Sequence, residues 1–324
     1  MVDTSVTTLA SDESTRFDAS SAPSLTAKAL LGLIKVVGLI PISLRSAIGG
    51  SLGNLVGRFP LRESTIASLH LQAFLPEISS SAMVPKVFAH VGRSMLESIN
   101  LKPLLHPPFR NITCPQWDTI VGWTKEERPI IALTAHTGNW DLLAAYAIAR
   151  GIPISTVGKE ARNPNVQVVL RSMREAYGVD TIWRSDRSGV KRIVACFKQR
   201  RVMAALIDQD TRVDSVFIPF FGTPAKTPSA LIELGKRFNA RFVSAFIVRT
   251  KGTKFEIHTR ELDQSQSVEG ILTQYHQHLE HIIRTHPDQW VWFHKRWRSV
   301  PSGTTFSTKE YLKVLRDKIA ASRT

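Results

Sequence analysis

The sequence predicts an α/β protein with a central mixed sheet flanked by helices and preceded by a helical segment that associates with a membrane. Two observations lead to this prediction. From residue 129 onward, short apolar runs of strand length alternate with longer stretches of helical spacing, which is typical of a sheet with helices on its faces. Between residues 25 and 110 the apolar residues recur at helical spacing instead. We therefore expect N-terminal helices at 25–110, an α/β domain at 111–305 and a C-terminal helix at 306–324.

The chain begins with residues rich in Ser, Thr, Asp and Ala, which predict a disordered tail at 1–24 rather than a secretory signal. The next stretch, Leu25 to Leu44, is apolar apart from Lys28 and Lys35. Its central part, Ala29 to Leu44, would rise about 24 Å as a helix, less than the roughly 30 Å hydrocarbon core of a bilayer. We expect this stretch to lie in the membrane interface. Packing on the protein's own core and a single tilted span are the alternatives.

Three glycines then follow at four-residue spacing, Gly49, Gly53 and Gly57. Such spacing lets two helices approach closely, although a glycine-rich helix without a special role has the same pattern. From Ser64 to Leu101 the apolar spacing predicts further helices, interrupted at Pro76.

The α/β part follows from the alternation of periods. The expected strands are Ile130 to Ala135, Ile154 to Val157, Val179 to Trp183, Val202 to Ile207, Val216 to Phe220, Arg241 to Arg249 and Lys254 to Thr259. The expected helices are Asn139 to Arg150, Pro164 to Tyr177, Ser188 to Arg201, Pro228 to Phe238 and Val268 to Arg284. Functional groups in such folds gather at the carboxyl ends of strands, which would place His136, the loop Asp208 to Asp210 and Arg184 along one edge.

Charge and cysteine content limit the function. The chain has 42 Lys and Arg against 27 Asp and Glu, a net charge of +15, which favours an anionic partner. No helix-turn-helix, RNA-recognition or zinc-finger pattern is present and the basic residues are dispersed, so we expect an anionic lipid and a membrane surface rather than nucleic acid. Cys114 and Cys196 lie far apart in apolar or mixed surroundings, which fits a reducing compartment without disulfides.

The stretch Pro129 to Asp141 contains the main candidate for chemistry. A predicted strand ends near His136, and Asp141 follows five residues later, near the start of the next helix. A turn between them would let the Asp141 carboxylate orient the His136 imidazole as a general base. Gly138 is small enough for a substrate to approach the backbone, and Asn139 can cap the helix. A histidine that only satisfies backbone groups at a strand end is the alternative.

Guanidinium and carboxylate groups supply further candidates. Arg171 and Arg174 share one helical face and suit bidentate recognition of phosphate, and Arg184 follows a predicted strand. A solvated helix face would have the same pattern. Asp208 and Asp210 could orient Arg or His side chains or form an ordinary turn. The oxygen-rich ligand set of a metal site is incomplete there, so no metal is expected.

Aromatic residues cluster at two places. Phe217, Phe220 and Phe221 would suit a groove for an acyl chain, with packing in the core as the alternative. The segment Pro287 to Arg298 mixes three Trp with basic side chains. It would suit a membrane interface, stacking on single-stranded nucleic acid, or packing on the core.

Several other kinds of site are not supported. His276, His278 and His281 do not form a zinc set, because only two of them share a helical face and no Cys completes the ligands. The chain has no Gly-x-Ser-x-Gly elbow, no phosphate loop and no dinucleotide glycine fingerprint. We therefore expect neither a covalent serine mechanism nor a bound cofactor.

Taken in order, the motifs resemble those of the bacterial lipid A biosynthesis acyltransferase family, the late lauroyl and myristoyl transferases. The resemblance covers about residues 28 to 300, and its first motif is shared with glycerolipid acyltransferases. The motifs are His136-x4-Asp141, Asn163-Pro164 with Arg174 and Gly178, Asp208-Gln-Asp210, Val216 to Thr227, and Pro287 to Trp297.

The resemblance implies that residues 111–305 form an acyltransferase domain at the cytoplasmic face of the inner membrane. It would move a fatty acyl group from an acyl carrier protein thioester, or acyl-CoA, to a hydroxyl of a membrane glycolipid such as a lipid A precursor. It makes His136 the general base and Asp141 its orienting carboxylate. For substrate binding or support of the site it implies Arg171, Arg174, Asp208 and Asp210, with Asn163 in a shared motif. Arg184 is a further substrate-binding candidate from the run of guanidinium groups.

One departure leaves the acceptor open. Where the family commonly has Tyr-Arg-Pro, this chain has Gly158-Lys-Glu160. A lysophospholipid or another glycolipid, such as a mannosylated phosphoinositide, is therefore an alternative acceptor. A non-catalytic lipid-binding or nucleic-acid-binding protein is an alternative of a different class. The length of the acyl chain depends on which side chain closes its groove, and the motifs do not identify that side chain.

Overall fold

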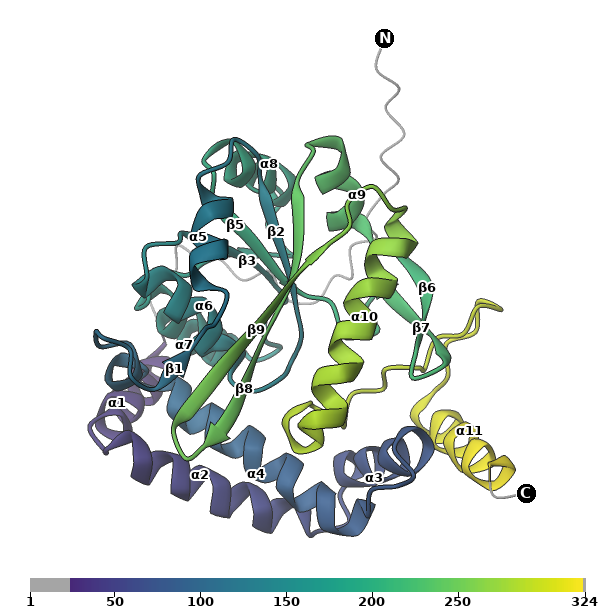
Figure 1. Cartoon of the computed structure of the whole chain (residues 1–324). Coiled ribbons are helices and arrows are strands. Elements are labelled where there is room, and N and C mark those ends of the chain that lie inside the picture. Colours follow the sequence, from purple (N-terminus) through teal and green to yellow (C-terminus); the bar gives the residue numbers. More distant parts are fainter. Residues whose placement is uncertain (1–23, 323–324) are drawn as a thin grey trace.

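A mixed seven-stranded sheet forms the centre of the computed structural model, which describes residues 24–322 (Figure 1). The strand order is β1-β9-β8-β2-β5-β3-β4; β8 and β9 are antiparallel and the other neighbours are parallel. A separate antiparallel pair consists of β6 and β7. The strands are β1 (Ile112–Thr113), β2 (Ile130–Thr134), β3 (Ile154–Gly158), β4 (Asp180–Trp183), β5 (Val202–Leu206), β6 (Ser215–Phe220), β7 (Thr223–Pro228), β8 (Arg241–Lys251) and β9 (Lys254–Leu262). The predicted mixed sheet is thus confirmed, while the tail expected at 1–24 lies almost entirely outside the described residues.

The α-helices in the described part of the chain are α1 (Leu25–Gly38), α2 (Ile42–Gly57), α3 (Arg62–Phe74), α4 (Ser80–Ser98), α5 (Trp117–Thr124), α6 (Trp140–Ala149), α7 (Pro164–Glu175), α8 (Gly189–Lys198), α9 (Ala230–Arg237), α10 (Val268–Thr285) and α11 (Thr308–Ala321). Short 3-10 turns occupy Lys102–Leu104 and Pro287–Gln289. The sequence missed β1, β7 and α5. β1 has two residues and β7 contains two prolines, so neither has a clear strand pattern.

Helices cover both faces of the sheet. On one face, Ile131, Leu133 and their neighbours pack with α9 and α10. On the other, Ile130 and Ala132 pack with residues of α5 and α6. Successive residues of β2 face opposite sides of the sheet because side chains alternate along a strand. Consequently, the sheet separates two apolar layers, and helices lie on both of its faces (Figure 1).

The N-terminal apolar stretch forms two helices rather than one. Helix α1 ends at Gly38, α2 begins at Ile42 after Pro41, and the helices meet at 115°. Pro41 explains the break, because its ring fixes φ and disfavours helix in the residue before it. The straight helix expected from Ala29 to Leu44 is therefore wrong. Within residues 24–322 no single helix is long and apolar enough to span a bilayer, although the bent pair together meets the length and composition required.

Glycines allow α2 to pack closely on α4. A Cβ atom at Gly49 would lie 2.3 Å from the carbonyl oxygen of Gly92, and one at Gly53 would lie 2.1 Å from that of Phe88. Both distances are far below van der Waals contact, so only glycine permits this approach. The close helix packing predicted from the glycine spacing is confirmed.

The C-terminal aromatic segment belongs to the core. Trp290, Trp292 and Trp297 are buried, and the Trp297 ring stacks on Phe74 with ring centroids 3.8 Å apart. The core-packing alternative is therefore the correct one for these three indoles, and they are not available to a membrane or to nucleic acid. This segment crosses the carboxyl edge of β2, where a bridge joins Thr137 to Trp290.

Candidate active site

A tight turn places His136 at the carboxyl end of β2. The backbone φ of Gly138 is +54°, and a Cβ atom there would lie 2.0 Å from the carbonyl oxygen of Ile247. The Gly138 N–H donates to the carbonyl of Gln289 at 3.0 Å. A residue with a side chain would suffer both backbone strain and a clash at this position.

Buried polar groups support the turn from below. Asn139 caps α6 as predicted, because its side-chain oxygen accepts from the backbone N–H of Leu142 at 3.1 Å. The same oxygen accepts from the Ser98 hydroxyl at 3.1 Å. The carboxylate of Glu97 is fully buried and accepts from Arg249 at 2.7 Å. Helix α4 and strand β8 therefore fix the turn that carries His136.

The His136 imidazole is paired with Asp208. Its Nδ1 lies 2.8 Å from Asp208 Oδ1, and its backbone N–H donates to Asp208 Oδ2 at 2.9 Å. The Trp290 indole also donates to Oδ2, at 2.8 Å. Sheet register explains the meeting, because Thr134 pairs with Leu206 and each functional residue lies two positions beyond its strand.

The electrostatics keep Asp208 ionised. The residue is 1% exposed, and burial by itself would raise the pKa of its carboxyl group. The positive charge that His136 carries when it is protonated, together with its hydrogen bonds, outweighs burial and lowers the pKa of Asp208 well below its usual range. An ionised carboxylate at Nδ1 keeps the proton on that nitrogen and leaves the lone pair on Nε2. Such an imidazole can act as a base at Nε2.

Two further residues, to which the sequence analysis gave no role, lie beside His136 and Asp208. The Gln209 amide nitrogen lies 3.2 Å from His136 Nε2 and 2.7 Å from His294 Nε2. Burial, followed by the neighbouring charge of His136, lowers the pKa of His294 to about 4. His294 is therefore neutral near pH 7. Both residues lie inside the predicted motifs, but spacing along the chain does not show that they meet.

Asp141 has a different partner from the one expected. Its carboxylate accepts from Arg174 Nε at 3.4 Å, and in the described residues the carboxylate bonded to His136 is Asp208. Asp141 lies in the first turn of α6, beside α7, which carries Arg174. In this structure the orienting contact predicted for Asp141 is therefore made by Asp208.

The remaining predicted residues fall into two groups. Arg171 and Arg174 lie on one side of α7, with guanidinium carbons 5.9 and 5.7 Å from the Trp183 ring, and Arg184 is exposed beyond β4. These three therefore lie beside Asp141, the Trp183 ring or the end of β4.

Asn163 and Asp210 have structural contacts. Asn163 caps α7 by accepting from the Asn165 N–H at 2.9 Å. Asp210 accepts from the Ser299 N–H at 2.9 Å and lies 3.7 Å from Arg298, so it anchors the C-terminal segment beside the site.

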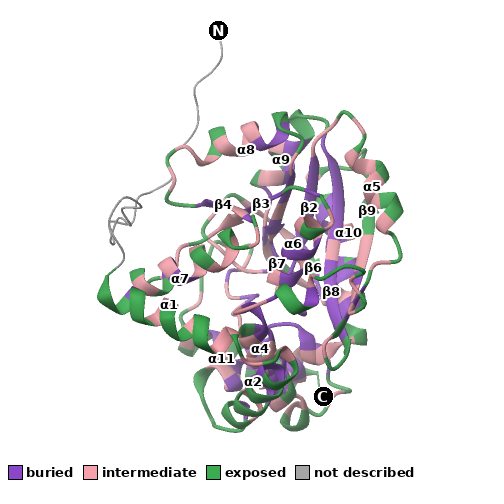
Figure 2. Cartoon of the chain, turned by 90° about the vertical axis from the view of Figure 1, so that its left-hand side faces the viewer, coloured by how far each residue is buried: buried purple, intermediate pink, exposed green. Residues whose placement is uncertain are grey.

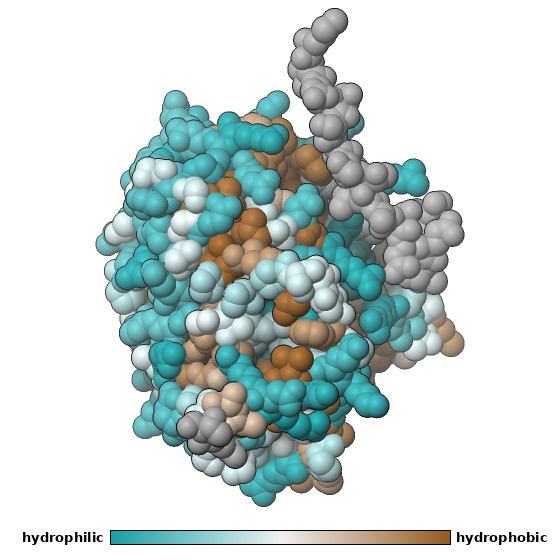
Figure 3. Space-filling model, turned by 90° about the vertical axis from the view of Figure 1, so that its right-hand side faces the viewer, coloured by the Kyte–Doolittle hydropathy of each residue, from teal (hydrophilic) through white to brown (hydrophobic). Residues whose placement is uncertain are grey.

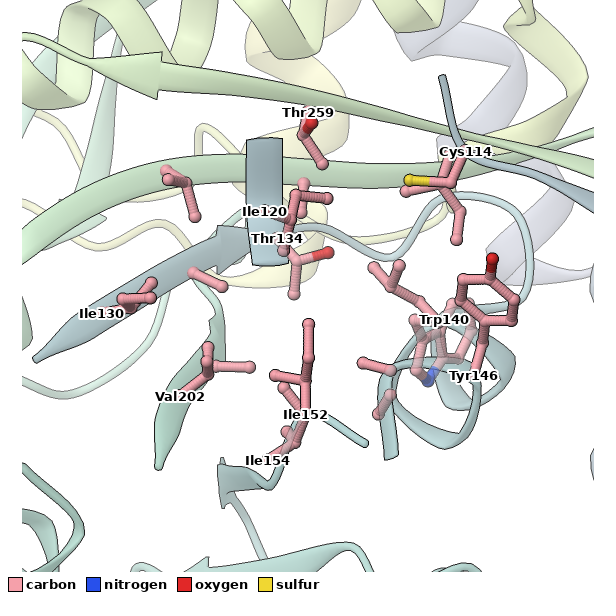
Figure 4. Close-up of a pocket in the computed structure, with 18 of the residues that line it drawn as sticks. Cys114, Ile120, Ile130, Thr134, Trp140, Tyr146, Ile152, Ile154, Val202 and Thr259 are labelled. Carbon is pink, nitrogen blue, oxygen red and sulfur yellow. The ribbon is translucent and has the colours of Figure 1, made fainter. Parts of the chain in front are cut away.

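An apolar cavity of about 110 Å³ is lined in part by Trp140, whose ring contacts His136 (Figure 4). It lies between the sheet and helices α5 and α6, and Thr134 and Trp140 form the part of its wall nearest His136. The Trp140 and His136 rings are 5.0 Å apart and meet edge to face. None of Phe217, Phe220 and Phe221, where a groove was expected, lines this cavity. Phe220 is fully buried against Trp297 instead.

Comparisons with known proteins identify the family of the chain. The family described as bacterial lipid A biosynthesis acyltransferase matches residues 17–299. A lipid A biosynthesis acyltransferase 2 of Shigella flexneri is 25% identical over 273 residues, covering 81% of this chain and 86% of the relative. A lipid A biosynthesis lauroyltransferase of Escherichia coli is 23% identical, covering 84% and 91%. A phosphatidylinositol mannoside acyltransferase of Mycobacterium tuberculosis is 22% identical, covering 50% and 52%. The chain is thus an acyltransferase and belongs to the bacterial lipid A biosynthesis acyltransferase family.

Proposed function

We propose that this enzyme transfers a fatty acyl group from an acyl carrier protein thioester, or from acyl-CoA, to a hydroxyl of a membrane glycolipid such as a lipid A precursor. The observation that supports this most directly is the pairing of His136 Nδ1 with buried Asp208 beside an apolar cavity. A base next to a space for a hydrocarbon chain is what O-acylation requires. The names of the relatives support a glycolipid acceptor.

In the proposed reaction, His136 Nε2 takes the proton of the acceptor hydroxyl as its oxygen attacks the thioester carbonyl carbon. The tetrahedral intermediate collapses, the carbon–sulfur bond breaks, and the thiolate receives the proton from His136. The products are an ester and a free thiol. Asp208 holds the imidazole in the required tautomer and stabilises the imidazolium that forms between the two proton transfers. No cofactor enters this sequence.

The acceptor is expected to be anionic. Arg171 and Arg174 of α7 both lie by the Trp183 ring, Arg174 also pairs with Asp141, and guanidinium groups bind phosphate through paired hydrogen bonds. We propose that they contact a phosphate of the lipid head group. The net charge of +15 favours the same class of acceptor and an acidic carrier protein as the donor's partner.

The proposed place of the enzyme is the cytoplasmic face of the inner membrane, bound through α1 and α2. Leu44, Ile48, Leu52 and Leu55 are exposed along one stripe of α2, opposite the glycines that pack on α4 (Figure 2). On the side that carries α10 and α11, hydrophilic residues predominate and hydrophobic patches are separate (Figure 3). A continuous exposed apolar stripe of this kind is typical of a helix in the membrane interface.

Vesicle pelleting tests the proposed membrane surface. Replacing Leu52 and Leu55 by Ser should release the protein from anionic phospholipid vesicles, because polar groups then face the acyl region. A Val190→Ser change, at an exposed apolar residue of α8, is the matched control and should leave pelleting unchanged. Equal binding by both variants would refute the assignment of this surface.

The His136→Ala variant tests the catalytic proposal. The assay measures transfer from a lauroyl thioester of acyl carrier protein to a lipid A precursor in vesicles. We expect the rate to fall by about a thousandfold, because the loss of a general base removes roughly that factor. His281→Ala, at an exposed histidine of α10, should retain the activity. Transfer by His136→Ala at the wild-type rate would show that another group is the base.

A further inference from the structure

We infer that Gln209 is a further catalytic residue, whose amide N–H donates to the carbonyl oxygen of the acyl thioester and stabilises the oxyanion formed there, and that His294 positions this amide. The inference rests on the proposed function, since it concerns the same transfer step. A general base removes a proton but leaves the negative charge on the carbonyl oxygen without a partner. Stabilising that charge is usually the largest single contribution to catalysis of acyl transfer.

The Gln209 amide nitrogen lies over the face of the His136 ring. It is 3.1 Å from Nδ1 and 3.2 Å from Nε2 of that imidazole. In the plane of the ring, a point so near both nitrogens would overlap the Cε1 carbon between them, so the amide nitrogen must lie above the plane. The Nε2 lone pair points outward within the plane. The amide is therefore adjacent to the base and leaves the position of the acceptor hydroxyl open.

His294 uses one of the two N–H groups of this amide. The Gln209 nitrogen lies 2.7 Å from His294 Nε2. Because burial lowers the pKa of His294 to about 4, its imidazole is neutral near pH 7 and Nε2 can hold the lone pair that accepts this hydrogen.

The second N–H of the amide remains for the substrate. Within residues 24–322, the hydrogen bonds of the Gln209 amide nitrogen lead to His136 and His294. His136 is a poor acceptor for it, because Asp208 keeps Nδ1 protonated and the Nε2 lone pair lies in the ring plane. A carbonyl oxygen bound next to Nε2 would give this N–H a better partner.

Both side chains lie on segments that the core holds in place. His294 comes two positions after Trp292, which is buried and donates from its indole to the carbonyl of Pro287 at 2.7 Å. Asp210, next to Gln209 in the chain, accepts from the Ser299 N–H at 2.9 Å. The amide is thus oriented before the substrate binds, which is what an effective oxyanion donor requires.

The amide would act on the charge that develops during attack. As the acceptor oxygen bonds to the thioester carbon, the π electron pair of the carbonyl moves onto its oxygen, and His136 Nε2 takes the hydroxyl proton. The oxyanion accepts the hydrogen bond from Gln209. On collapse the pair re-forms the carbonyl, the carbon–sulfur bond breaks, and the thiolate takes the proton from His136. Because the bond is strongest at the charged oxygen, it should raise kcat more than it lowers KM.

The first experiment measures kcat and KM for transfer from the lauroyl thioester of acyl carrier protein to a lipid A precursor in vesicles. Gln209→Met keeps an unbranched side chain of similar length without the donor, and Gln209→Glu replaces the donor by a carboxylate. Both should lower kcat by about a hundredfold or more with little change in KM. Gln199→Met, at an exposed glutamine that ends α8, is the matched control and should keep the wild-type kcat.

Two outcomes of this experiment have different meanings. A loss of kcat below about tenfold in Gln209→Met would overturn the inference and leave the proposed function standing. Absence of transfer by the wild-type enzyme would overturn the proposed function itself.

The second experiment replaces the carbonyl oxygen of the donor by sulfur, which is a weak hydrogen-bond acceptor. It compares kcat/KM for the lauroyl thioester and the matching dithioester. The preference of the wild-type enzyme for oxygen should shrink by about tenfold or more in Gln209→Met, because the variant already lacks the bond that sulfur weakens. Only active molecules contribute to this ratio, so it remains valid if part of the variant is unfolded. An unchanged preference would overturn the inference.

Variants of His294 test its positioning role with the same ratio. His294→Leu removes the acceptor and should lower both kcat and the preference for oxygen by about tenfold. His294→Gln can place an oxygen near the position of Nε2 and should restore most of both losses. A wild-type preference for oxygen in His294→Leu would refute the role assigned to His294.

Discussion

The Asp208→Asn substitution separates the two carboxylates that could orient His136. Asp208 accepts three hydrogen bonds, one at Oδ1 from His136 Nδ1 and two at Oδ2 from the His136 backbone and the Trp290 indole. An asparagine can keep its oxygen at the second position, where it satisfies both N–H donors. Its amide nitrogen then faces Nδ1, where it must donate a hydrogen.

The imidazole can accept that hydrogen bond only in its other tautomer. Nδ1 then has the lone pair and Nε2 holds the proton, so the nitrogen that should receive the hydroxyl proton is already occupied. Because each buried donor keeps a partner, we expect little change in stability, within about 1 kcal/mol. The rate should nevertheless fall by about a thousandfold or more, which corresponds to about 4 kcal/mol in the activation free energy.

The assay compares kcat, KM and the thermal midpoint for Asp208→Asn and Asp141→Asn. Asp141 is bonded to Arg174 in this structure, so its substitution should act mainly through KM for the acceptor. The reasoning would be refuted if Asp208→Asn kept more than about a tenth of kcat while Asp141→Asn abolished it. That result would restore the assignment made from the His-x4-Asp spacing.

Two further predictions concern stability. Gly53→Ala should destabilise the fold by about 1–3 kcal/mol, because its Cβ would lie 2.1 Å from the Phe88 carbonyl oxygen. The control is Gly32→Ala, whose Cβ would have nothing within 4 Å, so this change should be neutral or stabilising by up to about 1 kcal/mol. Urea unfolding measures both, and equal effects would contradict close packing of α2 on α4. Burial lowers the pKa of His70 to about 4 and that of His276 to about 3, so between about pH 6.5 and pH 4 the unfolded chain binds protons that the folded protein does not. The unfolding free energy should therefore be fully present above about pH 6.5 and fall as the pH drops toward 4, by roughly 3 kcal/mol per histidine. A stability that stays flat between pH 7 and pH 5 in urea titrations would contradict this.

Local patterns predicted most of the elements. Each of the seven expected strands of the α/β part is present, because a buried strand is a short apolar run that needs no knowledge of its neighbours. The glycine spacing in α2 also correctly predicted close packing on another helix, which the structure shows to be α4. The N-terminal stretch was treated as one helix to Leu44 although Pro41 closes the apolar run, and in the structure the chain turns at that proline.

The candidate site was only partly accessible from the sequence. The carboxyl ends of strands were the right place to look, and they identified His136 and Asp208 as candidates. Asp141 was preferred as the partner of His136 because it lies five residues away, whereas Asp208 lies 72 residues away. Distance along the chain is a poor guide when parallel strands bring their ends together. Trp290, Gln209 and His294 were missed as members of the site for the same reason.

By itself, the sequence determined the alternation of strands and helices, the place of His136 at a strand end and the family of the protein, because these depend on residue type and local spacing. Only the tertiary structure decided which carboxylate meets the imidazole and where the apolar cavity lies. The reason is physical: pairing Thr134 with Leu206 sets Asp208 beside His136, and pairing Ala132 with Ala204 opens the cavity. Such register is a property of two strands at once, and neither strand encodes it alone.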